Sequence, residues 1–77
     1  MSDTEAAKIA AGLTEAEKRT IRSAVLMVTG RYRMPYTTPK QVWEALWRDG
    51  LAEHGSSYLN AKGLAVRAYL TGASDNA

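Results

Sequence analysis

The 77-residue chain contains no cysteine and no phenylalanine, and it has a single histidine, His54. Without cysteine it can form neither a disulfide nor a thiolate metal site, which fits a reducing cytoplasm. A lone imidazole beside Gly55, in a predicted turn, is expected to be exposed. It lacks the neighbours that a catalytic triad or a metal centre requires. We therefore expect no enzymatic activity, no metal and no cofactor.

Long apolar runs are also missing. No stretch of 18 apolar residues occurs, and no charged start leads into an apolar run, so we expect neither a membrane helix nor a signal peptide. The net charge of +2 permits an anionic partner without requiring one. A chain this short forms one domain. We divide it into an N-terminal helix or arm (1–12), a core (13–72) and a flexible polar tail (73–77), and we expect it in the cytoplasm.

Start and stop signals divide the chain into helices over residues 2–12, 14–29, 38–49 and 61–71. The starts are three capping boxes and one asparagine cap: Ser2/Glu5, Thr14/Glu17, Thr38/Gln41 and Asn60. Three glycines suit the left-handed position just after a helix: Gly30, Gly50 and Gly72. Leu51 should contact Leu46 across the helix end at Gly50, as a Schellman motif expects.

The apolar run Ala24–Val28 is the most ambiguous stretch. Five apolar residues can form a strand, but the upstream cap and Gly30 favour the buried half of a helix. Residues 31–37 are expected to form a loop containing Pro35, either without regular structure or with one strand, and residues 51–59 read as a short hairpin with Gly55 in its turn. The predicted core is Ile21, Val25, Val28, Val42, Trp43, Leu46, Leu51, Leu59, Leu64 and Ala68.

The stretch "ALWRDGLAEHGSSYLNAKGLAVRAYL" resembles the end of winged helix-turn-helix domains, in which L-x-x-x-G-L closes a helix, a two-stranded wing follows, and LT-x-x-G opens the last helix. Asn60 stands where threonine is usual in that pattern. "LTEAEKRTIRSAV" resembles the opening helix of MarR-like repressors, and the whole is similar to small bacteriophage and prophage proteins. The resemblance implies a mainly α, compact winged-helix-like domain of about four helices with one small β-hairpin.

One feature departs from that family. A complete helix-turn-helix has a positioning helix before its recognition helix, but only about seven residues separate Gly30 from Thr38. Seven residues rise only about 10 Å as a helix, which is under two turns. We therefore expect the positioning helix to be missing or reduced to a turn.

Double-stranded DNA is the first expected partner, bound by a small transcriptional regulator. The segment Arg31-Tyr32-Arg33, with Tyr36 nearby, alternates guanidiniums that can hold phosphates with rings that can hydrogen-bond or stack. Lys40, Gln41 and Arg48 project from the helix that precedes the predicted wing, where glutamine suits adenine and arginine suits guanine.

A protein partner is the alternative, as in a phage-encoded inhibitor of a host enzyme or defence system. Trp47 lies at the edge of an apolar stripe, and tryptophan is enriched in interface hot spots. The last helix is apolar on two sides, which suggests that Val66, Tyr69 and Leu70 meet another surface. That surface is either the N-terminal helix of the same chain or the same helix of a second chain. The resemblance to dimeric regulators favours a homodimer through the first and last helices.

Overall fold

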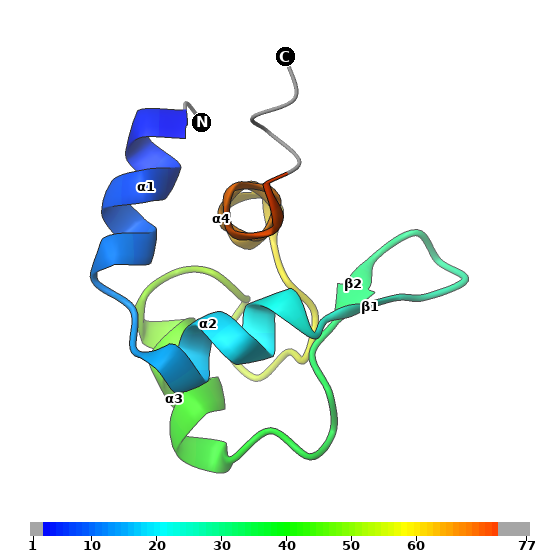
Figure 1. Cartoon of the computed structure of the whole chain (residues 1–77). Coiled ribbons are helices and arrows are strands. Elements are labelled where there is room, and N and C mark those ends of the chain that lie inside the picture. The colour runs from blue at the N-terminus through cyan, green and yellow to red at the C-terminus, as the bar shows by residue number, and fades with distance from the viewer. Residues whose placement is uncertain (1–2, 73–77) are drawn as a thin grey trace.

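Helix α4 (Ala61–Thr71) lies between two other helices, packing against both α1 (Asp3–Ala11) and α2 (Glu15–Arg22), while α2 also packs against α3 (Lys40–Arg48). The computed structural model describes residues 3–72. Two short strands, β1 (Val25–Leu26) and β2 (Tyr32–Arg33), form a hairpin that projects from the helices (Figure 1). Over the described range, the predicted class of a mainly α domain with four helices and one small β-hairpin is confirmed.

The capping box at the start of α2 is confirmed. Thr14 Oγ1 accepts a hydrogen bond from the Glu17 backbone N–H at 3.2 Å, and the Thr14 N–H donates to Glu17 Oε1 at 3.0 Å. Asn60 likewise caps α4, because its Oδ1 accepts from the Gly63 N–H at 2.9 Å. These reciprocal bonds satisfy backbone donors that the first helical turn leaves free.

The predicted Schellman ending of α3 is also confirmed. The Leu51 N–H donates to the Leu46 carbonyl at 3.0 Å, the Gly50 N–H donates to the Trp47 carbonyl at 3.1 Å, and Gly50 has φ +76°. The beginning of α3 differs from the prediction. Pro39, which has no capping side chain, occupies the cap position, and Thr38 Oγ1 donates to the Pro35 carbonyl at 2.6 Å. The Ser2 half of the first predicted box lies outside the described residues.

The predicted helix over 14–29 is wrong beyond Arg22. The chain turns at Ser23, and Val25 and Leu26 pair antiparallel with Arg33 and Tyr32. The Gly30 N–H donates to the Met27 carbonyl at 2.9 Å and closes the turn, and Gly30 has φ +85°. A glycine that could end a helix therefore serves a hairpin, since both sites require the left-handed conformation.

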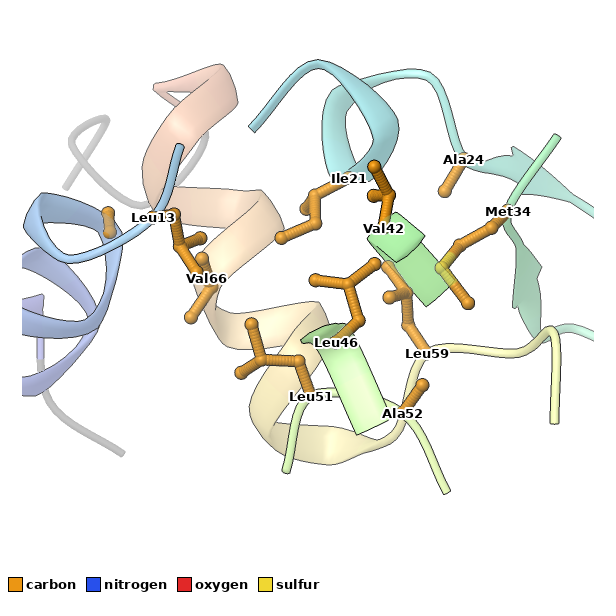
Figure 2. Packing of buried hydrophobic residues seen from close by; sticks show 11 residues of the cluster. Leu13, Ile21, Ala24, Met34, Val42, Leu46, Leu51, Ala52, Leu59 and Val66 are labelled. Carbon is orange, nitrogen blue, oxygen red and sulfur yellow. The ribbon is translucent and has the colours of Figure 1, made fainter. Parts of the chain in front are cut away.

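Because residues 25–33 form a hairpin, the observed core differs from the predicted core. Val25 is 56% exposed and Val28 fully exposed, so both core predictions are wrong, whereas Met34 is buried at 1% exposure. Trp43, Leu64 and Ala68 are half-buried at the edge of the core rather than inside it. The remaining predicted members are buried and point toward one another (Figure 2): Ile21, Val42, Leu46, Leu51 and Leu59.

The hairpin predicted over 51–59 is reduced to a single bridge, Ala52 to Leu59. A second bridge, Arg33 to Tyr58, joins this segment to β2. The Leu59 N–H donates to the Tyr32 carbonyl at 2.9 Å, and the Met34 N–H donates to the Ser57 carbonyl at 2.8 Å. The position of the small hairpin is thus corrected to 25–33, and residues 57–59 continue its pairing.

Helix α1 covers α4 within the same chain. Ala6 and Ala10 are buried at 2% and 3% exposure, and Val66 of α4 is completely buried. The assignment of Val66 to an interface is therefore wrong, because this side chain belongs to the core. Tyr69 and Leu70 are half-buried against that core, and a homodimer stays a prediction. No helix within residues 3–72 has the length and apolar character needed to cross a membrane.

Candidate nucleic-acid interface

Positive charge is concentrated in the middle of the chain. Residues 18–43 contain no aspartate or glutamate but carry six of the ten cationic side chains: Lys18, Arg19, Arg22, Arg31, Arg33 and Lys40. Lys18 pairs with Glu15 at 3.5 Å, and the other five are exposed. An acid-free stretch of this kind favours an anionic partner.

Two arginine guanidiniums stack on tyrosine rings. The Arg31 guanidinium lies over the Tyr58 ring at 4.7 Å from its centroid, and the Arg67 guanidinium lies over Tyr32 at 4.2 Å. With Arg33 added, we term these residues the arginine–tyrosine cluster. Because side chains alternate along a strand, Arg31, Arg33 and Tyr58 lie on one face of the β2 segment, and Tyr32 with Arg67 lies on the other. Tyr32 and Arg33 form β2, and Arg31 directly precedes this strand. Tyr58 forms a bridge with Arg33, and Arg67 lies on α4.

None of the three guanidiniums in the cluster forms an ion pair within residues 3–72. Arg67 Nε is buried and has no hydrogen-bond partner there. Stacking on a ring positions a guanidinium without consuming its N–H donors, which remain suited to phosphate. The cluster can therefore present oriented donors to an anion.

The six residues predicted to contact DNA fall into two groups. Arg31, Tyr32 and Arg33 lie together at the hairpin, whereas Lys40, Gln41 and Arg48 are exposed along α3, which lies apart from the hairpin (Figure 1). Arg48 is 3.9 Å from Asp49 Oδ1. No helix occurs between Gly30 and Thr38, as expected from the shortness of this segment.

Sequence reasoning missed Tyr58 and Arg67 as members of the cluster. Arg67 is 35 residues from the tyrosine on which it stacks, and each looks like an ordinary surface residue in its own segment. The alternation of arginine and tyrosine was a local signal, but its completion depends on the docking of α4.

Comparison of the chain with protein-family models, with curated proteins and with solved structures found no match.

Large apolar side chains are exposed on the hairpin and in the loop after β2. They are Val25, Leu26, Val28 and Tyr36. Between the hairpin and the loop that follows β2 lies a pocket of about 190 Å³, lined by Val25, Met27, Arg33, Met34, Pro35 and Tyr36. An apolar pocket of this kind can accept one ligand group.

Trp47 has an internal role that the sequence did not reveal. Its indole Nε1–H donates to the Ser56 carbonyl at 2.7 Å, and its ring lies 5.3 Å from that of His54. The indole thus ties α3 to the turn before Tyr58, and His54 is exposed as expected. Interface roles for Trp47, Tyr69 and Leu70 stay predictions. Residues 3–72 contain no group of three potential ligands that could hold a metal.

A carboxyl pair joins α2 to the end of α3. Glu17 is buried at 6% exposure, and its Oε2 has no hydrogen-bond partner. Burial and the nearby Glu17 carboxyl raise the pKa of Asp49, although Arg48 and Lys62 oppose the shift.

Asp49→Asn is expected to raise the melting temperature at pH 7 and to raise it less at pH 3.5. A carboxyl whose pKa is raised in the folded state contributes to stability in acid, and this contribution is lost as pH rises through that pKa. Asparagine does not lose stability in this way as pH rises. The substitution also removes a negative charge from the C-terminal end of α3, where its interaction with the helix dipole is unfavourable by about 0.5 kcal/mol. Thermal unfolding followed by circular dichroism at both pH values measures the effect. Glu53→Gln, at an exposed carboxylate, is the control, and an equal gain at both pH values would contradict the role of the pair.

Proposed function

We propose that the protein is a small DNA-binding regulator that holds phosphates on its arginine–tyrosine cluster. The observation that supports this proposal is the set of three guanidiniums without a carboxylate partner among residues 3–72, two of them already stacked on tyrosines. Ordering a free arginine side chain on a ligand has an entropic cost, which stacking reduces in advance. The acid-free segment 18–43 adds a favourable field around the cluster.

The contacts are divided between two surfaces. Arg31 and Arg33 contact phosphates of the DNA backbone, and such contacts position the protein without reading the base sequence. Lys40, Gln41 and Arg48 on α3 are the candidates for base contacts, although α3 lacks the preceding helix that usually sets its position. The proposal therefore expects strong dependence on phosphate contacts and modest sequence preference. It places the protein in the cytoplasm with its DNA.

The double variant Arg31→Gln/Arg33→Gln is expected to bind duplex DNA at least tenfold more weakly at low salt. Each lost phosphate contact should also lower the slope of log K against log salt by about one. Fluorescence anisotropy with a labelled 20-base-pair duplex at 50 and 200 mM salt measures both quantities. Lys8→Gln is the single-site control, because Lys8 is exposed on α1, away from the hairpin (Figure 1).

Circular dichroism should show that the double variant remains folded, since a cation–π contact at an exposed site contributes only about 0.5–1 kcal/mol. Equal affinity and equal salt slope for the double variant and the unchanged protein would remove the cluster from the proposal. Failure of the unchanged protein to bind the paired duplex at 50 mM salt would reject binding to double-stranded DNA.

A protein partner is the second candidate, favoured by the exposed apolar residues of the hairpin. Apolar contact loses little affinity as salt rises, whereas phosphate contact loses much. A pull-down from host lysate with and without nuclease separates the two candidates. Partners that persist after nuclease treatment would support the second.

A further inference from the structure

The pocket beside the hairpin is apolar on nearly all sides but has one cationic wall. Val25 and Met27 contribute from β1 and the turn, and Pro35 and Tyr36 contribute from the loop after β2. Met34, at 1% exposure, closes the buried side, and Tyr36, at 83% exposure, stands at the rim. Arg33 is the only charged residue in the lining.

The size of this pocket restricts its ligand. Its volume of about 190 Å³ is below the roughly 300–1,000 Å³ that is typical of drug-sized ligand sites. It suits one flat ring that stacks through its faces, such as a nucleobase, or one apolar side chain of a protein. The surrounding charge favours the first, because Arg31 is exposed beside β2 and no carboxylate occurs between residues 18 and 43. A nucleotide combines a flat base, which can stack through its faces, with the phosphate that these guanidiniums can hold.

We propose that this pocket receives one unstacked base of the bound DNA, with the base against the Tyr36 ring and its flanking phosphates on Arg33 and Arg31. This inference rests on the proposed DNA-binding function and specifies the kind of DNA. A base within an intact duplex must first be unpaired and extruded, at an energetic cost. A base in a single strand or a bulge is already available. The preferred ligand is therefore single-stranded DNA or a duplex with an unpaired base.

Three DNA probes of the same sequence test the pocket. They are a 20-nucleotide single strand, the fully paired duplex, and that duplex with one extra unpaired 2-aminopurine. We expect the unchanged protein to bind the single strand and the bulged duplex roughly tenfold more tightly than the paired duplex, in line with base–aromatic stacking. The fluorescence of 2-aminopurine should change on binding, because it reports the stacking of that base.

Tyr36→Ala should remove this preference, with about tenfold weaker binding to the single strand and the bulge and little change on the paired duplex. Tyr36→Phe should retain the preference, because it keeps the ring. Val28→Ala is the matched control, since Val28 is exposed on the hairpin that precedes the Tyr36 loop but does not line the pocket. Because Tyr36 is highly exposed, the Tyr36→Ala variant should remain folded, and circular dichroism verifies this.

Two results would overturn the inference in distinguishable ways. Equal binding to all three probes, unaffected by Tyr36→Ala, would reject the base pocket while leaving phosphate-driven DNA binding in place. Absence of binding to every probe would reject the proposed function and the base pocket together. In that case, nuclease-resistant capture of a partner that is lost in Tyr36→Ala would assign the pocket to a protein side chain instead.

Discussion

Gly63→Ala is expected to remove a large part of the stability of the fold. Gly63 is buried in the first turn of α4, and a β-carbon there would collide with the backbone carbonyl oxygen of Leu51. The same oxygen accepts the Asn60 N–H at 3.0 Å, so it cannot move away without loss of that bond. The helix must therefore separate from the strand-like segment that follows α3.

The sign of the effect depends on two opposing contributions. Alanine in place of glycine within a helix gains about 1 kcal/mol of helix propensity. Overpacking a rigid contact costs about 1–3 kcal/mol, and more where backbone must move, and the Asn60 bond adds about 1 kcal/mol. We expect a net loss of about 3 kcal/mol. A 77-residue domain has a total stability of only about 4–10 kcal/mol.

Urea unfolding followed by tryptophan fluorescence measures this loss. Gly12→Ala is the matched control, because a β-carbon at Gly12 would meet only the Ile9 carbonyl oxygen, at an ordinary 3.6 Å. Gly12→Ala should be neutral or slightly stabilising. Unchanged stability in Gly63→Ala would show that α4 does not approach Leu51 as closely as described.

The features that sequence predicted best are those whose cause is local. The Thr14 capping box, the Asn60 cap and the Schellman ending at Gly50 each depend on residues within a few positions of one another. Gly63 stands at the glycine position of the LT-x-x-G pattern that the start of the last helix resembles. The structure supplies the physical reason for that glycine, which is the close approach of a backbone carbonyl.

The run Ala24–Val28 could not be assigned in this way, since its apolar residues suit a buried helix and a strand equally. Its conformation depends on pairing with Tyr32 and Arg33, and Gly30 is compatible with both outcomes. The candidate site shows the same division. Arg31, Tyr32 and Arg33 were found from their alternation, whereas Tyr58 and Arg67 join them only through tertiary packing.

The packing of α4 is the source of the second large effect. Val66 is completely buried, in a core that also contains Leu13, Ile21 and Leu51 (Figure 2). α1 covers α4 in the same chain, so the apolar second side of α4 does not require another molecule. A substitution at Val66 should consequently affect folding rather than association.

Val66→Asp is expected to abolish folding. A buried carboxylate without a partner costs several kcal/mol, which is comparable to the whole stability of a domain of this size. Ala61→Asp is the control on the same helix, because Ala61 is exposed in the first turn, where a negative charge interacts favourably with the helix dipole. Circular dichroism should show loss of helix in Val66→Asp and its retention in Ala61→Asp. If Val66 instead lay between two chains, sedimentation would detect a folded Val66→Asp monomer, and this result would contradict the burial of Val66 within a single chain.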